Sequence, residues 1–256
     1  MNLYSIRSRC RSFHKRLAWL LSCVFILFSI KPYAHEQVIS FSLATAEAPP
    51  YVYLSENNEI KGTLINKLER AQKDSALKIE ILIMPWARAL NEVKQNRIDA
   101  IMPTLWSEDR AKYLEYPNLP FYSGDESVLI KRASDDFEFN ELSNIPSNKV
   151  IGKIRLVVIN AAFDKLVKQG KLRTYETPKL DQVLLMLAQK KIDLVASEGS
   201  IAATTIKNLG LEGTFKTYSL HVDSTPAYMA FSPNFAAKYD INKIMDIIIR
   251  QSTSTK

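Results

Sequence analysis

Two segments of the chain share one pattern, and it restricts the folds open to the sequence. Each segment predicts a helix that ends in basic residues, then an Ile-Asp pair and an apolar strand. The segments are residues 89–103, ALNEVKQNRIDAIMP, and residues 183–197, VLLMLAQKKIDLVAS. A helix that leads into a buried strand is typical of α/β sheets flanked by helices. Because the pattern occurs only twice, it predicts two similar α/β lobes and not a solenoid.

The segments around the first copy extend the pattern to a whole lobe. Paired prolines at 49 and 50 exclude a helix there, and YVYLSENNEI predicts a hairpin that turns at Asn57 and Asn58. The alternation of strand and helix favours a parallel sheet. The predicted strands are 37–45, 77–84 and 97–103, and the predicted helices are 63–76 and one that begins at Pro85.

The segments around the second copy repeat the alternation. A helix over 161–170 is predicted to end at Gly170, because glycine commonly follows the last helical turn. The other predicted elements are strand-like segments at 149–160, 172–177, 191–197 and 225–234, and helices at 179–190 and 241–251.

The first 34 residues have a different character. Five basic residues precede an apolar run of about 14 residues, Leu17 to Ile30, and Ala34 closes the segment. This order predicts a secretory signal cleaved after Ala34, and therefore a periplasmic protein. The run is shorter than the roughly 20 residues of a transmembrane helix, and an uncleaved N-terminal anchor is the alternative.

The predicted signal accounts for the charge and the cysteines. The whole chain carries +7, but residues 1–34 hold six Lys or Arg and no acid, so the remainder carries +1. The high pI is therefore no argument for nucleic-acid binding. Cys10 and Cys23 both fall in the signal, which excludes a disulfide or a thiolate metal site from the mature chain.

Enzyme motifs are missing from the sequence. It contains no G-x-S-x-G, no H-E-x-x-H and no P-loop. His35 and His221 are the only histidines after the predicted signal, too few for a histidine metal site. We therefore expect no catalytic residues, no metal and no cofactor.

One arginine and one glutamate follow equivalent predicted strands. Arg110 ends the loop TLWSEDR after the strand at 97–103, and Glu198 follows the strand at 191–197. Ligands of open α/β sheets lie outside the carboxyl ends of strands. A guanidinium binds a carboxylate through two parallel hydrogen bonds, and a carboxylate binds an ammonium. Two lobes that close on a small zwitterion need this pair of charges, although Arg110 could instead pair with Glu108 or Asp109 on the surface.

Several longer stretches resemble a known family. APPYVYLSENNEIKG, RIDAIMPTLWSEDRAKYLEYPNLPFY and KIDLVASEG are similar to the bacterial extracellular solute-binding proteins of the amino-acid-binding family, family 3. The resemblance covers nearly all of residues 37–250, and the arginine segment is its most specific part. It implies the type II periplasmic-binding fold, α/β and two-lobed, with two interlobe crossings.

The resemblance also assigns roles to residues. It implies that Arg110 binds the ligand α-carboxylate, helped by the hydroxyl of Thr104 or Ser107, and that Glu198 binds the α-ammonium. The spacing from Asp99 to Arg110 is one residue shorter than usual, which leaves open which hydroxyl helps. The sequence also departs from the family at Asn66 and at Asn160-Ala161-Ala162, where a carboxylate and hydroxyl donors are common.

The topology places further residues at the predicted cleft. Tyr51, Trp106 and Glu47 are expected to line it, although one of Tyr51 and Tyr53 could serve packing alone and Glu47 could belong to a solvated loop. Trp86 lies on an apolar helix face and is expected in the core. Arg88 could reach the cleft or cover the surface. Asp99 and Asp193 are expected to stabilise the turns before their strands.

Together these expectations define a function and its alternatives. Lobe one is predicted at 36–127 with 227–256, and lobe two at 128–226, with crossings near SGDESVLIKR and STPAYMAFS. We expect a monomer that binds an amino-acid-like solute and serves an ABC permease or a receptor. The alternatives are an exported enzyme on the same fold, similar to a cyclohexadienyl dehydratase with Glu47 or Glu198 as the acid, and a sensor or interaction module without a ligand.

Overall fold

The fold is taken from a computed structural model, which describes residues 38–73, 75–220 and 225–253. The predicted signal over 1–34 and the two histidines considered above, His35 and His221, lie outside the described residues. In the part that is described, no helix is both long and apolar enough to span a membrane.

The first lobe is built on a four-stranded sheet in the order β11-β5-β1-β4. Strands β1 and β4 pair in parallel from Ile39–Leu77 to Thr45–Ile83, and β5 joins β1 in parallel. Strand β11 returns from later in the chain and pairs antiparallel with β5. The strands are β1 (Ile39–Thr45), β4 (Leu77–Ile83), β5 (Ala100–Leu105) and β11 (Ala227–Phe231).

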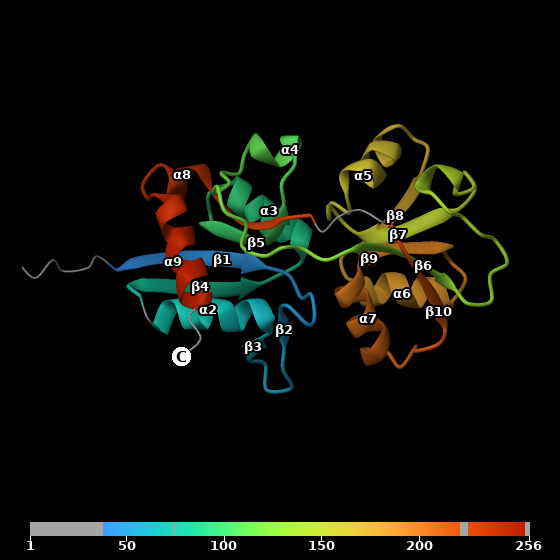
Figure 1. Cartoon of the computed structure of the whole chain (residues 1–256), viewed down its shortest axis with the longest axis horizontal. Helices are drawn as coiled ribbons and strands as arrows, with labels where there is room; N and C mark the ends of the chain where they lie inside the picture. The colour runs from blue at the N-terminus through green and yellow to red at the C-terminus, as the bar shows by residue number, and fades with distance from the viewer. Residues whose placement is uncertain (1–37, 74, 221–224, 254–256) are drawn as a thin grey trace, which may run out of the picture. The chain divides into compact units, whose positions relative to one another are not determined.

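Helices cover both faces of this sheet (Figure 1). Alternation along β1 explains this, because Phe41 and Leu43 join one apolar cluster and Ala44 joins the other. Helices α2 and α9 pack on the first cluster, and α3 packs on the second. The helices of this lobe are α2 (Thr63–Lys73), α3 (Trp86–Lys94), α4 (Glu108–Ala111), α8 (Pro233–Ala236) and α9 (Ile241–Thr253).

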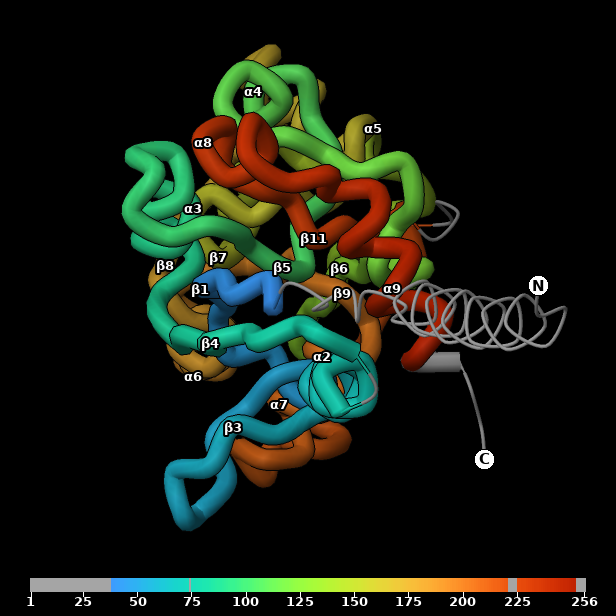
Figure 2. Tube along the Cα trace, turned by 90° about the vertical axis from the view of Figure 1, so that its left-hand side faces the viewer, coloured from blue at the N-terminus to red at the C-terminus, as the bar shows by residue number. Residues whose placement is uncertain are grey.

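A short hairpin, β2 (Tyr53–Leu54) with β3 (Ile60–Lys61), extends from the first lobe beside α2 (Figure 2). Its turn contains Asn58 at φ 59°, a left-handed backbone conformation that asparagine tolerates. The predicted hairpin and its asparagine turn are therefore confirmed.

The second lobe is built on a five-stranded sheet in the order β10-β6-β9-β7-β8. Strand β7 pairs in parallel with both β8 and β9, whereas β6 pairs antiparallel with β9 and β10. Val128 and Ile130 of β6 face the cluster under α6 and α7, and Leu129 faces the cluster under α5. The elements are β6 (Ser127–Arg132), a 3-10 turn (Leu142–Asn144), β7 (Val150–Ile154), α5 (Ala161–Lys168), β8 (Arg173–Thr177), α6 (Leu180–Ala188), β9 (Leu194–Glu198), α7 (Gly199–Asn208) and β10 (Phe215–Ser219).

The chain passes from the first lobe to the second before β6 and returns before β11. The two passages touch, because Tyr122 bridges Ala227 in antiparallel fashion. At Gly124, φ is +78°, and a Cβ there would lie 2.0 Å from the carbonyl oxygen of Thr225. Only glycine fits this close approach, so the two passages form a tightly packed pair.

Two aspartates hold equivalent positions in the two lobes. The Asp99 carboxylate accepts hydrogen bonds from the backbone N–H and the hydroxyl of Ser42, at 2.9 and 2.8 Å. The Asp193 carboxylate accepts from the Val150 N–H at 2.9 Å and pairs with Lys149 at 3.0 Å. Each carboxylate therefore ties the start of its strand to a neighbouring strand, a longer-range role than the expected stabilisation of the preceding turn.

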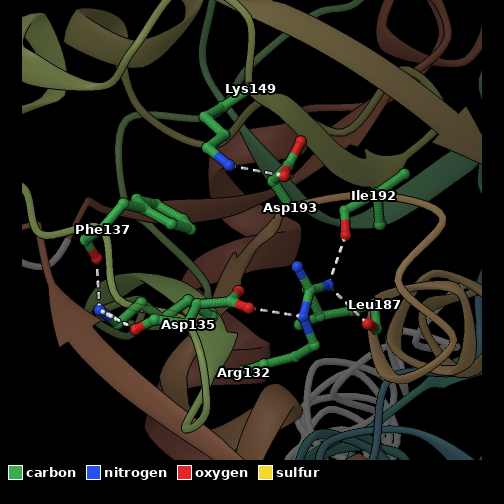
Figure 3. Close-up of polar contacts among 8 residues, drawn as sticks. Arg132, Asp135, Phe137, Lys149, Leu187, Ile192 and Asp193 are labelled. Atoms are coloured by element: carbon green, nitrogen blue, oxygen red, sulfur yellow. Dashed lines mark hydrogen bonds and ion pairs between the residues drawn. The ribbon is translucent and has the colours of Figure 1, made fainter.

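A buried arginine closes the turn before β9 (Figure 3). One Arg132 Nη donates to the carbonyl oxygens of Leu187 and Ile192, at 2.7 and 2.6 Å, and its Nε pairs with Asp135 at 2.9 Å. Leu187 lies in the last turn of α6, where backbone carbonyls lack helical partners and favour a cation. Arg132 therefore joins β6 to the exit of α6.

Three expectations need correction. The strand predicted over 149–160 ends at Ile154, because Leu156 adopts a left-handed conformation with φ 60°. The sheets are mixed and not purely parallel, since strands that follow a crossing enter each sheet in the opposite direction. Helix α7 and strand β10 are additional elements.

Candidate functional site

A cavity of about 280 Å³ lies between the two sheets and is lined by residues of both lobes. The carboxyl ends of β1, β4, β5, β7 and β9 meet there, which is where open α/β sheets bind ligands. Four lining residues are charged: Glu47, Arg110, Lys179 and Glu198. The other lining residues are Ser127 and Ser197, and the apolar Ala46, Ala48, Ile83, Met84, Pro85, Trp86, Pro103, Leu105, Ile154, Val157, Val158, Ile159, Pro178, Ala196, Ile201 and Ala227.

Arg110 is held at the cavity by both lobes. It belongs to α4, whose N-terminus is capped by Ser107, and only 5% of the residue is exposed. One Nη donates to the Thr104 hydroxyl at 2.8 Å and to the Leu105 carbonyl at 3.0 Å. The other Nη donates to the carbonyl of Leu156 in the second lobe at 2.8 Å.

Burial lowers the pKa of Arg110, but a guanidinium stays charged in proteins. Its Cζ lies 5.6 Å from the ring centre of Trp86, a cation–π distance. Three of its five N–H donors have the partners named above, so the group is fixed in direction and retains donor capacity for an anion in the cavity.

Glu198 is the last residue of β9 and faces the same cavity. Burial, followed by the nearby charge of Asp125, raises the pKa of its carboxyl to about 7. The hydroxyl of Tyr122 lies 3.5 Å from its Oε2, which is a weak contact. A half-buried carboxyl without a full counter-charge attracts a cationic group, because a cation would offset the cost of its partial burial.

Two ion pairs join the lobes near the cavity. Lys179, just before α6, pairs with Glu47, just after β1, at 3.0 Å. Lys168 of α5 pairs with Asp109 of α4 at 2.9 Å. Both pairs are largely exposed, so each adds little to stability. Of the two, only Glu47–Lys179 lines the cavity.

The apolar part of the wall also comes from both lobes. Ile154 and Val157 of the second lobe pack against the apolar cluster of Trp86 in the first. Trp86 is 6% exposed, which confirms the expectation that it is buried, and it also lines the cavity. Its indole Nε1–H has no hydrogen-bond partner among the described residues.

The structure brings some of the predicted site residues together and separates others. Arg110, Glu198 and Glu47 line the cavity. Thr104 is buried beneath Arg110 and accepts its hydrogen bond, and Ser107 accepts from the Arg110 backbone N–H at 3.3 Å. These two hydroxyls position Arg110.

Tyr51 and Trp106 are not among the residues that line the cavity. The Tyr51 ring packs against Tyr122, with 4.9 Å between centroids, and adds to the core of the first lobe. Trp106 is 56% exposed and is not among the cavity-lining residues. The exposed Arg88 lies 3.9 Å from Glu92 on its own helix.

Sequence reasoning missed two groups at the site. Lys179 follows Pro178 before a helix, and nothing in that local pattern indicates a partner more than a hundred residues earlier. The Leu156 carbonyl accepts from Arg110 at a point where the chain turns through a left-handed leucine, and sequence patterns seldom reveal such a turn.

The arrangement can bind a small molecule that carries opposite charges close together. One lobe supplies a guanidinium and the other a carboxylate, and the space between them is mostly apolar. Among the described residues, no cluster of three or more His, Cys, Asp or Glu side chains could hold a metal ion.

Comparisons with known proteins identify the family and the fold. The family model for bacterial extracellular solute-binding proteins, family 3, matches residues 42–210. No curated protein matches the chain in sequence.

Solved structures share the fold at low sequence identity. An ancestral arginine-binding protein bound to arginine is 16% identical, with a TM-score of 0.70 over 86% of this chain and 96% of that one. A histidine kinase sensor domain with similarity to periplasmic binding proteins is 15% identical, with a TM-score of 0.68 over 85% and 90%. A substrate-binding protein of an ABC uptake transporter from Streptococcus pneumoniae with bound histidine is 14% identical, with a TM-score of 0.66 over 83% and 85%. The expected two-lobed periplasmic-binding fold is thereby confirmed.

Proposed function

Because the chain belongs to the bacterial extracellular solute-binding proteins of family 3, we propose that it binds one small amino-acid-like solute in the interlobe cavity, in the periplasm. In this proposal Arg110 binds the α-carboxylate and Glu198 binds the α-ammonium. The observation that carries it is that these two opposite charges come from different lobes and line one cavity. Arginine and histidine bound to proteins of the same fold support an amino-acid ligand.

The energetics suffice for useful affinity. A hydrogen bond to a charged group contributes about 1.5–3 kcal/mol net, and micromolar binding needs about 8 kcal/mol. Two such bonds at Arg110, one at Glu198 and burial of part of the solute against the apolar wall reach that value. The bound solute then serves an inner-membrane ABC permease or a receptor, with the protein acting as a monomer after removal of the predicted signal.

Native mass spectrometry tests the proposal even though the ligand is not identified. Protein purified without denaturation should carry one small-molecule adduct per chain, or acquire one from a mixture of the L-amino acids. A thermal-shift screen of the same amino acids should identify the ligand, since a ligand at 100 times its Kd adds about 2.7 kcal/mol to stability. The proposal would be contradicted if no adduct is found and no amino acid shifts the unfolding temperature.

A second candidate function has one observation in its favour. A carboxyl whose pKa is raised to about 7 suits a general acid at neutral pH, and Glu198 meets that condition inside the cavity. The alternative is thus an exported dehydratase that protonates a departing hydroxyl. Incubation with prephenate should release phenylpyruvate if this alternative holds, whereas an unchanged compound would exclude that reaction.

A further inference from the structure

We infer that the cavity selects an amino acid whose side chain is uncharged and apolar, and that the Glu47–Lys179 ion pair excludes charged side chains. This inference rests on the proposed function, because it assumes that Arg110 and Glu198 bind the α-carboxylate and the α-ammonium. It adds the class of ligand and names the residues that determine specificity.

The charges around the cavity support this selection. Four lining residues are charged, and the proposed function uses two of them, Arg110 and Glu198. The other two, Glu47 and Lys179, neutralise each other at 3.0 Å. No charged lining residue in the described part of the chain is then left for a charged ligand side chain, and burial of an unpaired charge is strongly unfavourable.

The remaining wall favours apolar groups. The first lobe contributes the exit of β4 and the start of α3, Ile83 to Trp86, and the second lobe contributes Val157 to Ile159 and Ile201. These residues are aliphatic or aromatic, apart from one methionine and one proline, so a leucine-like or phenylalanine-like side chain gains from leaving water.

The ion pair is well placed to act as the specificity element. Glu47 follows β1 of the first lobe and Lys179 precedes α6 of the second, so the pair forms only between the two halves of the cavity wall. A cationic ligand side chain would have to displace Lys179 from Glu47, and an anionic one would have to displace Glu47 from Lys179. Either displacement breaks one ion pair to form another, so the charge of the ligand gains no net partner in the cavity.

Calorimetric titration of the full chain with L-leucine, L-phenylalanine, L-arginine and L-glutamate tests the inference. Leucine or phenylalanine should bind at least about tenfold more tightly than arginine and glutamate. Lys179→Met frees Glu47 and keeps an apolar side chain. In this variant the affinity for arginine relative to that for leucine should rise by about three- to tenfold. In Glu47→Gln the affinity for glutamate relative to that for leucine should rise. Lys171→Met, at an exposed lysine beyond α5, is the matched control and should leave every ratio unchanged.

Each of the following results would contradict the inference or the proposed function. If arginine or glutamate binds the unmodified chain as tightly as leucine, the inference is wrong while the proposed function stands. If Lys179→Met and Glu47→Gln leave the ratios unchanged, the ion pair does not determine specificity. If no amino acid binds at all, the proposed function fails and the inference fails with it.

Discussion

The environment of Glu198 conflicts with stability near neutral pH. Its raised pKa, about 7, means that the folded protein holds this proton more tightly than the unfolded chain does, where a glutamate titrates near 4.5. The stabilisation from that proton is complete below about pH 4.5 and is lost as the pH rises through 7. Near neutral pH the partly charged group destabilises the fold, as expected of a side chain kept for binding.

Replacement by the neutral isostere should reveal this cost. Glu198→Gln should equal the unmodified chain in stability at pH 4.5 and exceed it by roughly 1–3 kcal/mol at pH 8, because one pKa unit corresponds to about 1.4 kcal/mol. Urea unfolding at the two pH values measures the difference. Glu212→Gln, at an exposed glutamate after α7, is the control. An equal difference at both pH values would show that Glu198 does not titrate as described.

The same group should link ligand binding to pH. The ammonium of a ligand favours the charged form of Glu198. Below pH 7 the Glu198 carboxyl is mostly protonated, so binding must displace the proton from this carboxyl. Affinity should therefore fall as the pH drops from 7 to 5, by up to about tenfold per pH unit. Titrations in matched buffers measure this, and Glu198→Gln should bind more weakly with a flat pH profile. A pH-independent affinity in the unmodified chain would remove Glu198 from the site.

At the scale of elements, the paired passages between the lobes depend on one glycine. Gly124→Ala places a methyl group against the Thr225 carbonyl and also strains a backbone at φ +78°. Gly213 has nearly the same backbone, φ +76°, but nothing within 4 Å of the added carbon. Gly213→Ala therefore measures only the free-energy cost of placing alanine in this backbone conformation.

Comparison of the two variants isolates the crowding. Gly213→Ala should lose about 1 kcal/mol, and Gly124→Ala should lose about 1–3 kcal/mol more, because added carbon in packed surroundings forces a local shift. Chemical denaturation gives both values. Equal losses would mean that the two passages are not packed as the structure describes.

The two aspartates that begin the repeated strands give another test at this scale. Asp99→Ala and Asp193→Ala each leave a backbone N–H without its carboxylate partner, that of Ser42 or Val150. Each variant should lose about 1–3 kcal/mol of unfolding free energy. Asp136→Ala, at an exposed aspartate, should change it by less than about 0.5 kcal/mol. A loss of unfolding free energy in only one of the two variants would show that Asp99 and Asp193 do not have equivalent structural roles.

The same repeat shows why much of the fold could be predicted from the sequence. Hydrophobic periodicity and the Ile-Asp pair identified most strands and helices, because each buries one face or one stripe. Periodicity could not give the direction of β6, β10 and β11. Strand direction depends on where the chain crosses between lobes, which is a property of the whole topology and not of a local window.

For the site, the sequence indicated the residues that follow strands but not those that meet from opposite lobes. Arg110 and Glu198 follow the two repeated strands, and both line the cavity. Trp106 has the same kind of position, directly after β5, yet it is mainly exposed. The direction of a side chain after a strand depends on the local turn, and α4 turns Arg110 inward while leaving Trp106 outside.

At the scale of the whole molecule, the proposed binding depends on a cavity that neither lobe forms alone. Arg110 is bonded to Leu156 across the lobes, and the Glu47–Lys179 and Asp109–Lys168 pairs also join them. A solute that bridges Arg110 and Glu198 would add to these contacts, so binding and closure of the lobes are expected to be coupled.

Calorimetric titration of the unmodified chain and of Arg110→Ala, with the amino acid found by the thermal-shift screen, tests this claim most directly. We expect one site per chain and a loss of at least about 100-fold in affinity in the variant, since two charged hydrogen bonds are removed. Arg173→Ala, at an exposed arginine where β8 begins, should bind like the unmodified chain. Equal affinity in Arg110→Ala and the unmodified chain would show that Arg110 does not bind the solute.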